Sequence, residues 1–270
     1  NGVYWMDIID KRPDGLVVIS NITEGAKRKV ESIQMAIEPD LLYPLLRGRD
    51  VKRWHAEPSA YILMAQDPDK RRGIDEDEMK TNYPKTYLYL KRFEAALRER
   101  KSRGVTDMIE EGAPFYTMFS VGDYTFAPYK VVWREQASSL TGSVAFTVED
   151  KPIIPDHKLM LINCSTREGA YYLSGILNSS PAKFAAISYA VEIQFDTHLL
   201  QNIRIPKFDP GNKVHQELAG LSQNAHEAAA RGSETGLKGL EQRIDELAAQ
   251  IWGLTGEELK EIQTSLEEIA

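Results

Sequence analysis

The sequence predicts a mixed α/β (α+β) protein: a mixed β-sheet body with interspersed helices, followed by a C-terminal helical bundle. Up to residue 210, short runs rich in β-branched and aromatic residues alternate with helical periodicity. After Pro210 the strand-like runs stop and only amphipathic helical patterns remain. The 270 residues are 42% hydrophobic, which is enough to form a core. We therefore expect two domains, at 1–210 and 211–270.

The expected strands are short, are bounded by Gly, Pro, Asp or Asn, and consist of side chains that suit a half-buried pleated surface. They are residues 3–9, 16–19, 61–65, 129–134, 143–148, 158–164 and 202–206. Helices are expected at 83–101, where apolar residues recur every three or four positions, and at 168–190, which Ser179-Ser-Pro181 divides in two.

The C-terminal segment is expected to fold as three helices. Residues 214–230 form one amphipathic pattern. Leucine and isoleucine then recur at 3-4-3-4-3 spacing from Leu237 to Leu254, under three heptads, which favours packing on the preceding helix over a coiled coil. Thr255 and Glu258 match a capping box that begins the last helix.

Charge is unevenly distributed along the chain. The formal net charge is −7, but residues 211–270 hold five Lys/Arg against eleven Asp/Glu, which leaves 28 basic and 29 acidic residues in 1–210. Affinity for nucleic acid comes largely from phosphate neutralisation. A partner bound through charge therefore belongs to the first 210 residues, where the cations are clustered.

Cations lie beside flat side chains around residues 47–54, along the helix from Tyr83, and around residues 114–136. Such groups suit duplex DNA, because Lys and Arg neutralise phosphates, polar side chains reach base edges, and aromatic rings stack. The candidate DNA-binding residues are Arg47, Arg49, Lys52, Arg53, Lys91, Arg98, Arg100, Lys101, Tyr116, Lys130, Arg134 and Gln136.

Structural roles for these residues stay open. Aromatic side chains are most often part of a core. Lys91 and Arg98 also fit a solvated helix face paired with Glu94. The cations of Arg47–Arg53 also fit a structural cluster in which they pair with Asp50.

We expect no catalytic, cofactor-binding or metal-binding residues in this chain. Its five histidines have no metal-ligand spacing, and it lacks a phosphate loop, a G-x-G-x-x-G motif and the Asn-Pro-Pro-aromatic motif of adenine methyltransferases. The single Cys164 lies in an apolar run and is expected to be buried. Glu149-Asp-Lys151 could be fitted to a metal-dependent nuclease, but 40 acids and 33 bases produce such triplets by chance.

The sequence predicts a cytoplasmic protein without a membrane partner. No apolar run approaches the roughly 18 residues needed to span a bilayer, and the N-terminus lacks the layout of a signal peptide. The first residue is Asn, so we expect a processed chain or a piece of a longer one.

Residues 37–54, I-E-P-D-L-L-Y-P-L-L-R-G-R-D-V-K-R-W, resemble the "I-x-P-x-L-R-G-R-D-I-x-R-W/Y" segment of adenine-specific DNA methyltransferases. That segment opens their C-terminal target-recognition region, the Taq-type specificity domain, which is also found in type IIG restriction-modification enzymes. Further similar segments follow in the family's order, at 87–100, 114–116, 128–133, 156–162, 172–179, 203–206 and 244–255.

The resemblance implies a domain that recognises double-stranded DNA sequences and lacks the catalytic domain. S-adenosylmethionine would bind in that upstream catalytic domain of the same protein, and this chain would hold no cofactor. The parent would be an adenine methyltransferase of a restriction-modification system, with or without a restriction nuclease. The alternative is an assembly module of a defence system whose terminal helices dimerise, and a self-contained nuclease is the weakest reading.

Overall fold

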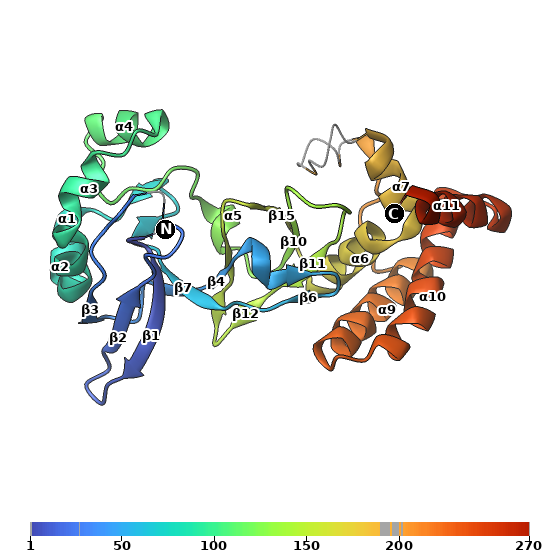
Figure 1. The fold of residues 1–270 in the computed structure, drawn as a ribbon, viewed down its shortest axis with the longest axis horizontal. Helices are drawn as coiled ribbons and strands as arrows, with labels where there is room; N and C mark the ends of the chain where they lie inside the picture. Colours follow the sequence, from blue (N-terminus) through green and yellow to red (C-terminus); the bar gives the residue numbers. More distant parts are fainter. Residues whose placement is uncertain (1, 27, 190–194, 196–199, 201, 270) are drawn as a thin grey trace. The chain divides into compact units, whose positions relative to one another are not determined.

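The computed structural model describes residues 2–26, 28–189, 195, 200 and 202–269, and it confirms the mixed α/β fold class (Figure 1). The chain forms two compact units. Unit 1 comprises Asn1–Leu45, Pro58–Ala127 and Val148–Ile154; unit 2 comprises Leu46–Glu57, Pro128–Thr147 and Pro155–Ala270. The chain therefore passes between the units five times. The domain boundary expected at residue 210 falls inside unit 2, because the helices that follow it pack on α6 (Arg167–Asn178).

Unit 1 is built around a six-stranded sheet with the order β14-β4-β7-β1-β2-β3. Its strands are β1 (Trp5–Lys11), β2 (Val17–Asn21), β3 (Gln34–Ile37), β4 (Leu42–Leu46), β7 (Ala60–Leu63) and β14 (Ile154–Pro155). In β2, Val17, Ile19 and Asn21 are buried and alternate with less buried residues, as expected for a strand with one face on a core.

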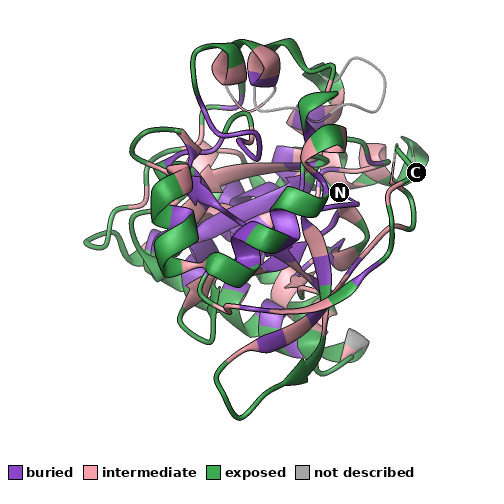
Figure 2. Ribbon diagram, turned by 90° about the vertical axis from the view of Figure 1, so that its left-hand side faces the viewer, coloured by how far each residue is buried: buried purple, intermediate pink, exposed green. Residues whose placement is uncertain are grey.

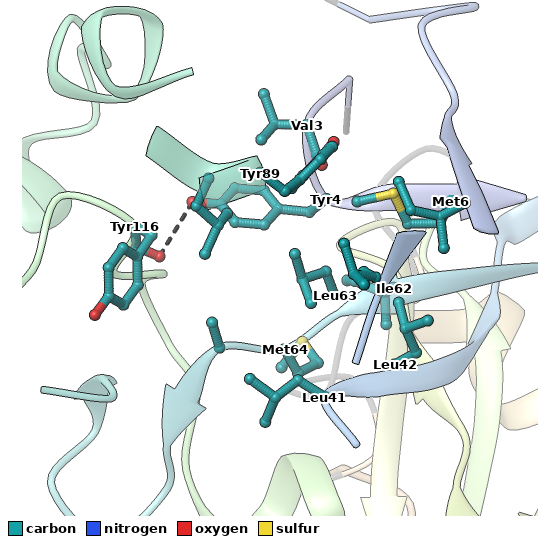
Figure 3. Close-up of a cluster of buried hydrophobic side chains, with 14 of the residues drawn as sticks. Val3, Tyr4, Met6, Leu41, Leu42, Ile62, Leu63, Met64, Tyr89 and Tyr116 are labelled. Atoms are coloured by element: carbon teal, nitrogen blue, oxygen red, sulfur yellow. Dashed lines mark hydrogen bonds between the residues drawn. The ribbon is translucent and has the colours of Figure 1, made fainter. Parts of the chain in front are cut away.

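The core of unit 1 joins the sheet to the loops around it (Figure 3). Leu42 lies opposite Leu63 across the β4–β7 pair. The Tyr4 hydroxyl donates to the Tyr116 carbonyl at 3.1 Å, and the Tyr89 hydroxyl donates to the Val3 carbonyl at 2.6 Å. These buried hydroxyls have the partners that burial requires.

Short helices flank the sheet of unit 1, and those in front of it in Figure 2 are exposed on their outer faces while the strands behind them are largely buried. They are α1 (Glu76–Asn82), α2 (Pro84–Arg92), α3 (Glu94–Arg98), α4 (Arg103–Glu110) and α5 (Asp123–Phe126). The single helix expected at 83–101 is interrupted at Phe93, whose ring is buried. The hairpin of β8 (Gln66–Asp67) and β9 (Arg72–Gly73) precedes these helices.

Unit 2 contains a three-stranded antiparallel sheet in the order β11-β10-β15, against which α6 packs. Its strands are β10 (Lys130–Arg134), β11 (Ser143–Ala145) and β15 (Leu159–Asn163). The 3-10 turn η1 (Gly48–Asp50) leads into the small hairpin of β5 (Val51–Lys52) and β6 (His55–Ala56). A further two-stranded pair, β12 (Thr147–Val148) with β13 (Lys151–Pro152), forms where the chain leaves unit 2 after Thr147.

Helices complete unit 2, and most of their expected positions are confirmed. They are α6, α7 (Ser180–Tyr189), α9 (Lys213–Ala230), α10 (Glu234–Trp252) and α11 (Gly256–Ile269). The expected break at Ser179 separates α6 from α7. The capping box is also present, since Thr255 N donates to Glu258 Oε2 at 2.7 Å and Glu258 N donates to Thr255 Oγ1 at 3.2 Å.

One expected strand is wrong. Residues 202–206 form no strand, because Ile205 N donates to the Ile203 carbonyl at 2.9 Å in a tight turn, and Pro206 has no N–H for a ladder. The burial of Ile203, which suggested a strand, serves the core beside β10 instead.

Within the part of the chain that the structure describes, no helix is long and apolar enough to cross a membrane.

Candidate nucleic-acid interface

Three exposed cations gather at one end of the three-stranded sheet of unit 2. Arg134 ends β10 and lies opposite Leu159 in the β10–β15 register. The neighbouring Glu135 N donates to the Lys158 carbonyl at 3.2 Å, so the backbone at Lys158 lies beside the end of β10. A Cβ on Gly48 would lie 3.8 Å from the Lys158 Cβ, which brings Arg49 to the same end. We call Arg49, Arg134 and Lys158 the basic edge.

The turn before β15 is fixed by a buried carboxylate. Asp156 is buried, its backbone N–H donates to the Leu46 carbonyl at 2.8 Å, and its Oδ1 accepts from Lys158 N at 2.8 Å. Sequence reasoning missed Lys158 and its exposed neighbour His157, although both lie in the quoted segment 156–162. The signal that could have found them is the charged Asp-His-Lys triplet directly before a strand.

Arg47 and Arg49, two residues apart, occupy different environments. Arg47 is buried, and its Nε lies 3.4 Å from Asp50 Oδ2, which also accepts from the Arg47 backbone N–H at 2.8 Å. Arg49 keeps 68% of its side chain exposed, and its Nε is 3.9 Å from Asp50 Oδ1. Arg47 thus braces the η1 turn, and Arg49 is the cation that the turn presents to solvent.

Arg53 and Trp54 tie the β5–β6 hairpin to the helices of unit 2. The Arg53 guanidinium lies 3.0 Å from Glu241 Oε1 and donates to the Asn178 carbonyl at 3.1 Å. The Trp54 Nε1–H donates to the same Glu241 oxygen at 2.7 Å, and its indole is 1% exposed. Burial lowers the pKa of Arg53. Lys52 is exposed, so Arg53 is structural while its neighbour is accessible.

The remaining candidates in unit 2 divide in the same way. Lys130 is fully buried within the sheet, and burial lowers its pKa to about 8. Gln136 and Arg134 are exposed. The structure therefore brings Arg49, Arg134 and Gln136 to the surface, and it keeps Lys130 inside.

The candidates in unit 1 are mostly engaged locally. Glu94 pairs with Lys91 at 2.5 Å and with Arg98 at 2.9 Å, and these contacts lower its pKa. Arg100 donates to the carbonyls of Leu97, Phe115 and Thr117 at 2.7, 2.6 and 2.8 Å.

Tyr116 and Lys101 differ in accessibility. Tyr116 is fully buried and its hydroxyl donates to the Ile74 carbonyl at 2.5 Å, so its ring is a core element of unit 1 in this structure. Lys101 is exposed. Of the four candidate cations in unit 1, Lys101 alone has no ion pair or side-chain hydrogen bond with any described residue.

No group of three or more His, Cys, Asp or Glu side chains among the described residues is arranged to hold a metal ion. Lys151, from the triplet fitted to a nuclease, donates from its Nζ to the carbonyls of Pro39, Asp40 and Leu42 at 2.6, 2.8 and 2.7 Å. It therefore ties the β13 segment to the loop before β4. Cys164 is partly buried rather than fully buried, and burial raises the pKa of its thiol to about 11, which keeps it protonated at neutral pH.

The comparisons with known proteins relate part of this chain to a methyltransferase. No protein-family model matches the chain. Over 148 residues, 54% of this chain, the sequence is 30% identical to the type II methyltransferase M.NspV of Nostoc sp.. The match spans 29% of the length of that relative. The chain is therefore homologous to part of a type II methyltransferase.

A solved structure shares the fold. The type IIL restriction-modification enzyme MmeI, whose structure was determined in complex with DNA, matches with a TM-score of 0.56 at 12% identity. The match covers 83% of this chain and 31% of MmeI, and it shows a shared fold. The type IIG restriction endonuclease BpuSI matches 78% of this chain and 26% of its own at a TM-score of 0.36, which is too low to support an argument.

Proposed function

We propose that this chain is the DNA sequence-recognition region of an adenine-specific DNA methyltransferase in a restriction-modification system. The observation that carries the proposal is the basic edge, where the segments of Arg49, Arg134 and Lys158 come together on a chain homologous to part of a type II methyltransferase. Segments 46–57, 128–147 and 155–210 of unit 2 together hold 11 Lys/Arg against 8 Asp/Glu, whereas the rest of the chain is acidic.

In this proposal the basic edge contacts phosphates, and exposed polar groups beside it, such as Gln136, reach base edges. S-adenosylmethionine would bind in the catalytic domain of the parent enzyme, which would be the partner of this chain. Methyl transfer would take place there, and the chain itself would supply target recognition.

The helices of unit 2 favour DNA recognition over the alternative of a dimerising assembly module. Ile244 and Leu247, in the middle of the heptad-like stripe, are each 1% exposed and pack in the same cluster as Trp54 and Tyr172. The middle of the stripe is therefore used for packing within unit 2, which leaves less apolar surface for a second copy.

Binding to random duplex DNA, measured by fluorescence anisotropy over a range of salt concentrations, tests the proposal. We expect weak binding, on the order of 10 μM at physiological salt, with a log K against log[salt] slope of several units. Arg49→Ala, Arg134→Ala and Lys158→Ala should each lower that slope by about 1. Lys238→Ala, at an exposed cation on the acidic α10, is the matched control and should leave the slope unchanged.

Sequence specificity needs a separate measurement, because phosphate contacts carry no sequence information. Selection from a pool of random duplexes should enrich one short motif that contains an adenine. No binding at low salt would exclude the proposal, and binding without any enriched motif would reduce it to non-specific DNA binding.

A further inference from the structure

An exposed aromatic patch in unit 1 is not used by the function proposed above. It consists of Phe119 and Tyr124, 59% and 41% exposed, with the cations Arg71, Lys101 and Arg103 beside them. The Arg71 Nε and the Tyr124 ring both approach Gly122, each about 3.5 Å from where a Cβ on that glycine would lie. A Cβ on Gly104, in the first turn of α4, would overlap the Phe119 ring.

Polar side chains hold the backbone of residues 116–118, directly before Phe119, through hydrogen bonds. Gln66 donates to the Tyr116 carbonyl at 2.9 Å and accepts from Met118 N at 2.8 Å. Thr117 accepts from Gly73 N at 3.0 Å, and Arg100 donates to the Thr117 carbonyl at 2.8 Å. This network fixes the loop directly before the exposed ring, so the ring is presented from a preorganised support.

Arg71 of the patch and Ser120, which follows Phe119, have backbone conformations that residues other than glycine rarely adopt. Arg71 has φ of 53° and Ser120 has φ of 56°. The Tyr124 hydroxyl donates to the Ser120 carbonyl, which closes the turn. Such conformations cost free energy and cluster at functional sites, where the surrounding structure maintains them.

The charges around the patch favour an anionic partner. In the run Lys70-Arg71-Arg72, Asp75 pairs with Lys70 and Arg72, each at 2.8 Å, while Arg71 has no ion pair with any described residue. Arg103 keeps 95% of its side chain exposed and lies 3.8 Å from Asp107. Of the four cations in residues 98–103, Arg98 pairs with Glu94 and Arg100 donates to backbone carbonyls, which leaves Lys101 and Arg103 for a partner.

We propose that this aromatic patch is a second DNA-contact site, in which Phe119 stacks on a base or packs against a sugar while Arg71, Lys101 and Arg103 meet phosphates. Aromatic rings with flanking cations are the combination that binds nucleic acid without reading its sequence. The inference rests on the proposed function and adds a contact on unit 1 to the basic edge of unit 2.

Site-specific photocrosslinking tests the position of the contact in the 270-residue chain. A benzophenone amino acid placed at position 119 should crosslink to random duplex DNA on irradiation. The matched control is the same amino acid at Ile9, which is 53% exposed in β1; the β1–β2 hairpin and α4 lie at opposite ends of unit 1 (Figure 1). Position 9 should give background crosslinking.

Affinity measurements test the chemistry. Phe119→Ala should weaken binding about fivefold or more, and Phe119→Trp should retain it, because stacking tolerates a change of aromatic ring. Arg71→Asn removes the cation with a residue that tolerates positive φ, and should lower the salt slope by about 1. Gly104→Ala, which displaces the ring without removing it, should weaken binding while circular dichroism stays unchanged.

The failure of this inference can be distinguished from the failure of the proposed function. If Arg49→Ala weakens binding but position 119 crosslinks no better than position 9 and Phe119→Ala binds normally, the patch is not a DNA contact and the proposed function stands. A crosslink between two copies of the chain would instead make the patch a self-association surface. No DNA binding at all would overturn both.

Discussion

In unit 1 the guanidinium of Arg100 donates to three backbone carbonyls, whereas in unit 2 Arg49 keeps 68% of its side chain exposed. Both residues lie in cation-rich runs of similar density. The difference is that Arg100 stabilises a loop, while the turn containing Arg49 already has Arg47 to brace it. The density of cations in a sequence therefore does not identify an interface. The contacts of each cation in the folded protein decide whether it is available to a partner.

The units also differ in the ionisable groups that they bury. Unit 1 buries the phenols of Tyr4, Tyr89 and Tyr116, whose pKa values burial raises. Unit 2 buries His226 and Lys130, whose pKa values burial lowers. Unit 2 also buries Tyr172, whose pKa burial raises to about 12, so both units should lose stability in strong alkali. His226 should add an acid response to unit 2, and amide hydrogen exchange followed by mass spectrometry can measure each unit separately.

The largest change in the relative stability of the two units should come from Trp54→Ala, which leaves a cavity in the core of unit 2. The indole contacts the His226 ring edge to face at 5.4 Å and donates to Glu241. Loss of a buried Trp side chain costs about 3–5 kcal/mol. Protection of α9 and α10 should fall by that amount, and protection of β1 and β2 should not.

Trp54→Phe is the control for this substitution, since it keeps an aromatic ring and removes the Nε1 donor. It should cost less than the alanine variant. An equal loss of protection in β1 and β2 would contradict the assignment of this side chain to unit 2 alone.

His226 should make unit 2 sensitive to acid. Its Nε2 accepts from Val144 N at 3.2 Å, so its Nδ1 carries the proton that contacts the Ser222 carbonyl at 2.7 Å. Burial lowers its pKa from 6.5 to about 4. Its contribution is therefore complete above pH 6.5 and is lost as the pH falls towards 4, by up to about 3 kcal/mol.

Exchange rates of α9 amides between pH 7 and pH 4, corrected for intrinsic rates, measure this loss. His226→Gln provides both a donor and an acceptor but no ionisable group, so it should remove the pH dependence. If the variant keeps the same acid sensitivity as the original chain, another group is responsible.

Tyr4 should produce the opposite response in unit 1. Burial raises its pKa from 10.0 to about 12. Its contribution is complete below pH 10 and is lost as the pH rises to 12, by about 2–3 kcal/mol. Tyr4→Phe should cost about 1 kcal/mol at pH 7, because the hydrogen bond to Tyr116 is lost, and should reduce the alkaline loss in β1 and β7. An unchanged alkaline response would show that Tyr89 or Tyr116 dominates.

The smallest effect should come from Glu217→Gln, which breaks the exposed ion pair of Glu217 with Arg243 at 2.9 Å between α9 and α10. Exposed ion pairs are screened by water and contribute little to stability. Protection in both helices should stay within experimental error of the original chain. A clear loss would mean that the acidic helices depend on surface charge more than on the buried Ile244 and Leu247.

Periodicity was sufficient to predict the helices of unit 2, because 3.6-residue spacing reports directly on the buried face of a helix. It also located β10 and β15. It did not predict the break at Phe93 or the turn at Ile203, since a buried apolar side chain looks the same in sequence whether its backbone is regular or not.

The candidate site was predictable only in part. The run around Arg49 and the end of β10 could be singled out from their charge. The segment of Lys158, more than a hundred residues beyond Arg49, contacts both, and the sequence does not show this. The exposure of Phe119 could not be predicted from the sequence, because tertiary packing decides whether an aromatic ring is buried. The division of the chain at residue 210 followed composition, which does not record that Trp54 pairs with Glu241.

The five crossings between the units have a consequence for how this protein can be made and changed. During synthesis Trp54 leaves the ribosome 187 residues before its partner Glu241, and the edge strand β14 of the first sheet follows only at Ile154. Early segments must therefore stay unpaired for a large part of translation, which slows folding and exposes apolar surface. For the same reason, a chimera joined by a single cut between residues 46 and 154 would separate segments from their own unit, so an exchange has to keep all the segments of a unit together.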